Sequence, residues 1–223
     1  MDWIDLGNPV PFDELQSYSP KVWSTGEVVR LVPPDKIVTP AFHDVAFNRR
    51  SRRHFSPISN DELSTLLWLT ARTQDAETNS SKAITLRRTP VPSAGALHPV
   101  HIIIKGDSKT DWWLYDRDNH ELRSLVETGD IFDPLLDQIN QVVPRGAASV
   151  ILLVAEPGKT MAKYKNACSL VWRDAGVLLA HFGLAAESIR LNFCALGITG
   201  EPWTSLLDDQ NRLVGVGVAL VGA

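Results

Sequence analysis

The run ASVILLVA, residues 148–155, constrains the fold more than any other stretch of the sequence. Its apolar residues follow one another without the alternation of a strand that has one solvent-facing side. A continuous apolar run of this length is typical of a buried strand. We therefore predict a central strand here and a final strand over residues 215–222, GVGVALVG.

Helical spacing of apolar residues is clearest between residues 167 and 190, where it runs from Val171 to Ile189. At about 1.5 Å per residue such a helix spans roughly 35 Å, which is the width of a domain. Charged residues such as Arg173 and Asp174 exclude a membrane helix. We predict that this segment is the longest helix of the fold.

The remaining patterns mix helices and strands. Ser59 and Glu62 have the spacing of a capping box, which predicts a helix that runs to about Arg72. Further predicted elements are a strand over 101–105, a hairpin over 111–125, a helix that starts at Asp133 as N-cap with Pro134 following, and a loop over 73–86. Because the elements do not alternate as βαβ units, the sequence predicts an α+β fold with a central, mostly antiparallel sheet flanked by helices.

Prolines set the first 45 residues apart from the rest of the chain. Six prolines between positions 9 and 40 remove backbone donors and disfavour regular helix. We predict an irregular arm over residues 1–45, which packs on something because it also carries Trp3 and Trp23. Residues 46–223 show no second boundary and are predicted to form a single domain.

Composition and charge exclude several classes of function. The net charge of −4 argues against a general nucleic-acid binder. Two cysteines, Cys168 and Cys194, do not complete a zinc site, so no metal is predicted. The acidic N-terminus lacks the features of a signal peptide, and no apolar run reaches the roughly 20 residues that span a bilayer. The sequence therefore predicts a cytoplasmic protein with neither a membrane nor a nucleic-acid partner.

Four arginines and a serine fall within five positions of the segment NRRSRRHF, residues 48–55. In an extended segment Arg49, Ser51 and Arg53 point the same way. Guanidinium groups bind phosphate oxygens bidentately, and each charge-assisted bond contributes roughly 1.5–3 kcal/mol. The segment is either a clamp for a cofactor phosphate or a solvated basic turn. No glycine-rich phosphate loop accompanies it.

The order of motifs resembles a known family. The pattern R-R-S-x-R-x-F is followed by P-S-A-G-A, then by a long helix that ends in a small-residue loop. This order is similar to that of the FMN-dependent nitroreductase superfamily over residues 46–221. Within it the chain most resembles the peptide dehydrogenases that oxidise azoline rings to thiazoles and oxazoles. The resemblance implies a nitroreductase-like FMN-binding domain over residues 46–223, with the long helix at a homodimer interface.

The resemblance also assigns roles to three segments, each of which has a purely structural alternative: a basic turn, a strand-entry turn and a helix C-terminus. The first segment is expected to grip the flavin phosphate and ribityl chain, the second to run along the flavin, and the third to offer backbone N–H groups to flavin N5 and its neighbours. The residues concerned are Arg49, Arg50, Ser51 and Arg53 in the first segment, Pro92, Ser93, Ala94 and Gly95 in the second, and Ala195, Leu196, Gly197 and Ile198 in the third.

A Lys-Tyr pair in MAKYKN, residues 161–166, matches the pair that the dehydrogenase branch carries before its long helix. Aromatising an azoline removes a hydride and a proton, and a desolvated lysine can accept that proton near neutral pH. The resemblance therefore implies that Lys163 is a catalytic base and that Tyr164 relays the proton or polarises the substrate. The alternative is an ordinary amphipathic turn with solvated lysines.

The expected function is an FMN-dependent oxidoreductase that transfers hydride from an azoline or similar substrate to flavin N5. The substrate is a small molecule or a modified peptide. One alternative is a nitro- or quinone-type reductase that takes hydride from NAD(P)H. Another is a catalytically silent relative that serves as a dimeric scaffold.

Overall fold

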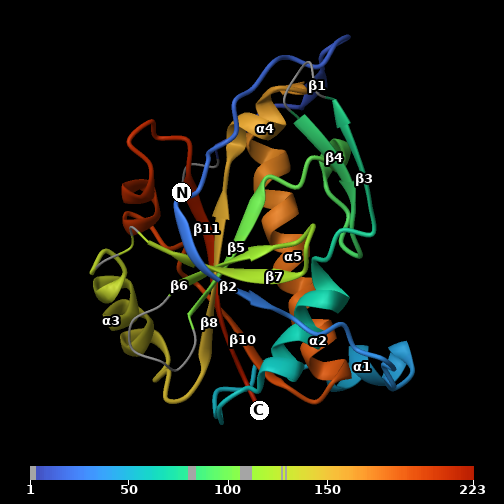
Figure 1. Cartoon of the computed structure of the whole chain (residues 1–223), viewed down its shortest axis with the longest axis vertical. Helices are drawn as coiled ribbons and strands as arrows, with labels where there is room; N and C mark the ends of the chain where they lie inside the picture. Colours follow the sequence, from blue (N-terminus) through green and yellow to red (C-terminus); the bar gives the residue numbers. More distant parts are fainter. Residues whose placement is uncertain (1–3, 80–83, 106–111, 127, 129) are drawn as a thin grey trace.

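The structure is a computed structural model that describes residues 4–79, 84–105, 112–126, 128 and 130–223 (Figure 1). Its centre is a seven-stranded sheet in which every neighbouring pair is antiparallel, which confirms the predicted sheet. In spatial order the strands are β10 (Asn192–Leu196), β11 (Val214–Gly222), β8 (Ser149–Ala155), β5 (Val100–Lys105), β6 (Trp112–Asp116), β7 (Glu121–Leu125) and β2 (Thr25–Arg30).

Strand β8 lies inside the sheet, between β11 and β5. All seven of its residues are buried. Successive side chains of a strand face opposite sides of the sheet, so a strand with helices on both sides needs apolar residues throughout. The unbroken apolar run is therefore the sequence signature of this position, and the prediction of a central strand is confirmed.

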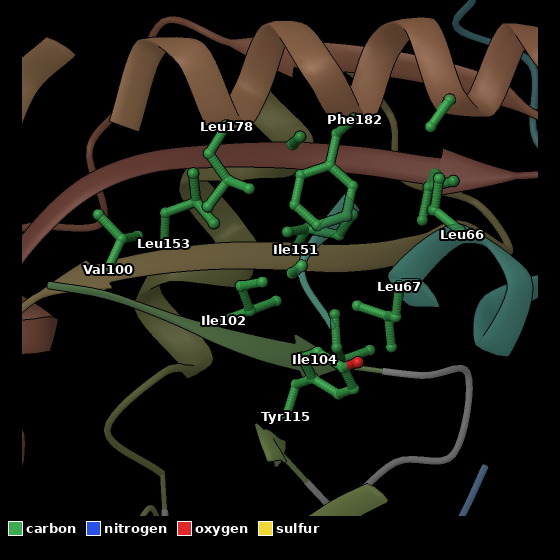
Figure 2. Packing of buried hydrophobic residues seen from close by; sticks show 14 of the residues in the cluster. Leu66, Leu67, Val100, Ile102, Ile104, Tyr115, Ile151, Leu153, Leu178 and Phe182 are labelled. Carbon is green, nitrogen blue, oxygen red and sulfur yellow. The ribbon is translucent and has the colours of Figure 1, made fainter. Parts of the chain in front are cut away.

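One face of the sheet is covered by α2 (Asn60–Thr70) and α5 (Cys168–Ser188), as Figure 1 shows. Leu178 and Phe182 of α5 pack on Ile151 and Leu153 of β8 (Figure 2). Helix α2 begins with the predicted capping box, in which the Ser59 and Glu62 side chains each bond the other residue's backbone N–H. The long helix and the capped helix are thus both confirmed.

The opposite face is covered by α3 (Asp133–Val142) and the short helix η3 (Trp203–Leu207). Leu135 and Ile139 of α3 pack in a second core with Leu152 of β8. The predicted cap of α3 is displaced by one residue, because Phe132 is the N-cap and Asp133 is already helical. No helix within the described ranges is long and apolar enough to cross a membrane.

The N-terminal arm contains more regular structure than its prolines suggest. Strand β1 (Val10–Pro11) pairs with β9 (Tyr164–Lys165), and helix α1 (Phe42–Asn48) ends the arm. Residues 25–30 form β2, which pairs with β7 at the edge of the main sheet. This corrects the expectation of an irregular arm for these residues, because TGEVVR is a proline-free stretch between Pro20 and Pro33. The domain boundary at residue 46 stays a prediction.

Three further strands and a short helix were not expected from the sequence. Strands β3 (Asp75–Asn79) and β4 (Ile84–Arg88) form a hairpin where a loop over residues 73–86 was predicted. Strand β10 follows α5 directly, and helix α4 (Pro157–Met161) follows β8.

Candidate active site

A loop with unusual backbone geometry enters β5. It includes η2 (Ala94–Ala96), which is one turn of 3-10 helix, and Gly95 within this turn has a φ of 63°. The loop is fastened to α5 by Asp174, which accepts hydrogen bonds from the Ser93 hydroxyl and, at 3.2 Å, from the Ala94 amide. The Ser93 hydroxyl oxygen in turn accepts a bond of 3.0 Å from the His98 amide. One carboxylate therefore fixes the segment that was predicted to run along a flavin.

The Asp174 side chain is buried and forms no ion pair within the described part of the chain. Burial raises the pKa of this carboxyl, while the bonds from Ser93 and Ala94 work against the rise. A buried carboxylate is retained only where hydrogen bonds compensate for its lost hydration. The hydrogen bonds from Ser93 and Ala94, which hold the loop, provide that compensation for Asp174.

Lys163 and Tyr164 lie against Gly95, 68 residues earlier in the chain. The Lys163 amine is 3.4 Å from the Gly95 carbonyl oxygen. A Cβ on Gly95 would lie 2.8 Å from Lys163 Cδ and 2.9 Å from the Tyr164 hydroxyl oxygen. Glycine is needed here both for its positive φ and for the close approach of the two side chains. The structure thus brings together two of the motifs that the sequence had only suggested.

The N-terminal arm supports the Lys-Tyr pair from behind. The Phe12 amide donates to the Lys163 carbonyl oxygen at 2.9 Å, and Pro11 is the strand partner of Tyr164. Both side chains remain half-buried. The arm therefore fixes the backbone of the pair while leaving its side chains directed at the loop.

The arginine-rich segment divides into one structural residue and three free ones. Arg52 forms a two-pronged ion pair with Glu187 of α5, and its amide donates to the Phe193 carbonyl oxygen. The other members of the segment are exposed and form no ion pair within the described ranges; they are Arg49, Arg50 and Arg53, with Ser51 among them. Arg52, which was not among the residues predicted to bind the phosphate, is thus the residue that anchors the segment to α5.

The two predicted flavin-binding segments meet α5 at different points. The loop contacts Asp174, whereas Arg49 lies near Gly183, nine residues further along the helix, and Arg52 is bound to Glu187. At about 1.5 Å per residue, nine residues correspond to roughly 14 Å along the axis. Within one chain the arginine segment and the Ser93 loop therefore line two separate stretches of the same helix.

The third predicted segment is only partly a loop. Ala195 and Leu196 are the last residues of β10, paired with Ala219 and Val218, which corrects the expectation of a loop there. Strand β10 is an edge strand, so one of its sides carries backbone groups that β11 does not pair. The next residue, Gly197, faces open space, because an added Cβ would meet nothing within 4 Å. Ile198 packs on the second core.

Sequence reasoning missed two contributors, Asp174 and Phe12. Asp174 falls on the buried side of α5 together with Val171, Ala175 and Leu178. A charged residue on an apolar helix face is a detectable signal, since a buried carboxylate requires partners. Phe12 contributes only its backbone, for which the sequence carries no signal.

The fold, a large antiparallel sheet flanked by helices, is that of the nitroreductase-like α+β class of oxidoreductases. The chain belongs to the nitroreductase family, because the model of that family matches residues 46–208. Members of this family are FMN-dependent. A comparison with curated proteins finds no match.

Solved structures share the fold at low sequence identity. A protein assigned as a nitroreductase from Ralstonia eutropha has a TM-score of 0.63 and 17% identity, covering 96% of this chain and 97% of that one. A chain of the E. coli microcin synthetase McbBCD complex, with truncated pro-MccB17 bound, has a TM-score of 0.59 and 15% identity, covering 85% and 74%. A Desulfovibrio desulfuricans protein assigned as a nitroreductase, in complex with FMN, has a TM-score of 0.52 and 16% identity, covering 83% and 87%.

Proposed function

We propose that this chain binds FMN and dehydrogenates an azoline or similar ring, with Lys163 and Tyr164 acting on the substrate. The observation that carries the proposal is the contact of both side chains with Gly95, in the loop that is predicted to run along the flavin. The fold is shared with a chain of a peptide-bound synthetase complex and also with proteins assigned as nitroreductases, so the choice of the azoline branch rests on the Lys-Tyr contact.

The free cations of the arginine segment fit the phosphate of FMN. Of its four arginines, only Arg52 has a carboxylate partner within the described residues. The donors available to a phosphate are the guanidinium groups of Arg49, Arg50 and Arg53 and the hydroxyl of Ser51. The open space beside Gly197 and the edge of β10 that β11 does not pair, where the Phe193 carbonyl is already bonded to the Arg52 amide, suit a flat ring that needs backbone donors.

The residues of this chain supply the proton chemistry. Bound FMN would supply the acceptor for the hydride that leaves the substrate carbon. The amine of Lys163 takes the proton from the adjacent ring carbon, so the C–H electron pair becomes the new ring double bond. The Tyr164 hydroxyl donates a hydrogen bond that orients the substrate ring. Asp174 keeps Gly95 and its carbonyl in place beside the amine.

The first test is the absorbance spectrum of the purified chain with added FMN, beside an Arg53→Ala variant. Retained flavin in the wild-type protein and loss in the variant is the expected result. Turnover of an azoline-containing peptide is then measured for Lys163→Met, which should keep flavin and lose dehydrogenation. Flavin binding with oxidation of NAD(P)H but no azoline turnover would favour the reductase. An absence of flavin uptake would favour the scaffold.

We also propose that two copies complete the site. The outward side of α5 exposes Trp172 and Val177, at 47% and 41%, beside the open Gly176. A two-fold contact through this face crosses two α5 helices and can bring the Asp174 region of one copy toward the Gly183 region of its partner. That arrangement joins the loop and the arginine segment that one chain keeps apart. Light scattering should give a dimer mass, and Trp172→Glu should lower both the mass and flavin retention.

A further inference from the structure

A separate cavity of about 260 Å³ lies on the α3 side of the sheet, where the N-terminal arm crosses the ends of β5, β6 and β7. Leu114 and Arg123, which are direct partners across β6 and β7, form part of its floor. Trp23 of the arm forms part of its wall. His98, at the end of the Gly95 loop, lines it, but neither Gly95 nor the Lys-Tyr pair does, so the cavity adjoins the candidate active site without including these residues.

Most charges around this cavity are already balanced. Its acidic wall residues are both engaged, and its lysine is paired with a fully buried glutamate. The pairs are Arg87 with Asp118 at 2.7 Å, Arg123 with Asp116 at 3.0 Å, and Lys159 with Glu156 at 2.9 Å.

Arg117 is the exception among the cavity's cations. Its guanidinium donates to the Val100 carbonyl oxygen, and it has no carboxylate within 4.0 Å in the described part of the chain. Burial, together with the neighbouring charge of Arg87, lowers the pKa of Arg117 to about 10. Asp118 and Asp116 offset only part of this decrease, and a bound anion would stabilise the charged form further.

Two further donors in the cavity wall lack acceptors. The Trp23 indole N–H and the Arg123 Nε–H are both buried, and neither has a hydrogen-bond partner within the described residues. Buried donors almost always find an acceptor, so unpaired ones point to a missing partner. The three residues that carry these groups, Arg117, Trp23 and Arg123, all line the cavity.

We propose that this cavity binds a small oxyanion, which is a carboxylate or a phosphate group. Arg117 is its ionic partner, and the N–H groups of Trp23 and Arg123 are further hydrogen-bond donors. The volume is slightly below the roughly 300 Å³ at which drug-sized pockets begin, so it suits a small anion and not a whole nucleotide cofactor. All three of these groups are hydrogen-bond donors. They therefore match the oxygen acceptors of an anion and offer no ligand to a cation.

The test is calorimetric titration of the full chain saturated with FMN, so that the arginine segment is filled, with inorganic phosphate or succinate as the probe. Sodium chloride of equal ionic strength serves as the screening control. Saturable binding of one equivalent of either probe is expected, and the probe that binds identifies the source of the oxyanion. Failure of both probes to bind the wild-type chain would overturn the proposal.

Variants locate the binding. Arg117→Met should weaken it at least tenfold, whereas Arg30→Met, at an exposed arginine outside the cavity, should leave it unchanged. Trp23→Phe keeps an aromatic ring, removes the N–H and should weaken binding severalfold, which covers the case that Arg117→Met does not fold. Equal affinity in all three variants would refute the site. Arg53→Ala should still bind the probe, which separates this site from the proposed FMN clamp.

Discussion

At the scale of single residues, Gly95 couples backbone conformation to the placement of two side chains. Gly95→Ala should cost about 1–2 kcal/mol in unfolding free energy, because alanine resists a φ of 63°. The added methyl would also push Lys163 and Tyr164 away, and displacements of about 1 Å can lower turnover roughly 10²-fold. Chemical denaturation and azoline turnover measure the two effects.

Gly146→Ala is the matched control. Gly146 has a φ of 55°, but an added Cβ there would meet nothing within 4 Å. Its stability loss should resemble that of Gly95→Ala while turnover is retained. Equal turnover in both variants would show that the Lys-Tyr contact with the loop has no catalytic importance.

The sequence could predict the members of this contact but not the contact itself. The PSAGA loop and the Lys-Tyr pair are short motifs with recognisable spacing, and the structure places them together. Their anchor, Asp174, was used only as an argument against a membrane helix. Which partner a buried carboxylate finds depends on tertiary packing, in this case on a serine 81 residues away.

At the scale of elements, Glu156 joins the N-terminal arm to the start of α4. Its fully buried carboxylate accepts bonds from the Tyr18 hydroxyl at 2.8 Å and the Lys21 amide at 2.6 Å, and also from His101 and Lys159. Glu156→Ala should lower the unfolding free energy by about 3–5 kcal/mol, because the mostly buried Lys159 charge loses its partner. Urea denaturation measures this.

Tyr18→Phe tests the arm contact alone and should cost about 1 kcal/mol, since it removes a single hydrogen bond. The tyrosine ring packs on Gly158, where a Cβ would lie 2.1 Å from it, and phenylalanine keeps that packing. A loss as large as that of Glu156→Ala would mean that the arm, and not the buried ion pair, accounts for the stability of this corner.

Asp174 sets the position of a loop relative to a helix. Asp174→Ala should lower the unfolding free energy by about 1–3 kcal/mol, because the Ser93 hydroxyl and Ala94 amide lose their acceptor. Asp174→Asn keeps one acceptor oxygen and should cost less. Thermal denaturation of the two variants decides this, and an alanine variant as stable as wild type would contradict the anchoring role.

Element prediction succeeded where one pattern dominated. Strand β8 and helices α2 and α5 carry long apolar runs, a capping box or helical spacing, and all three form as predicted. Edge and surface elements were missed. Strand β2 has only one neighbouring strand, and the β3–β4 hairpin lies outside the main sheet, so neither has the apolar run that marks a central strand.

At the scale of the whole molecule, buried and half-buried histidines make the fold sensitive to acid. The pKa values of His98, His101 and His120 are each lowered to about 4, first by burial and then by a nearby cation. In the unfolded chain a histidine titrates near 6.5. The unfolded state therefore binds more protons between about pH 6.5 and 4, and stability falls as the pH decreases through that window.

Each such histidine contributes up to about 1.4 kcal/mol per pH unit within the window. The lowered pKa of Asp118, about 2, extends the loss to more acid pH, whereas the raised pKa of Asp174 opposes it, because that carboxyl is protonated more readily in the folded state. Three histidines outweigh one carboxyl, so the urea midpoint should decrease steadily from pH 7 to pH 4.5. His120→Gln should flatten the curve, while His54→Gln, at an exposed position, should not. A wild-type midpoint that stays constant from pH 7 to pH 4.5 would show that these histidines are hydrated in solution and can charge without opening the fold.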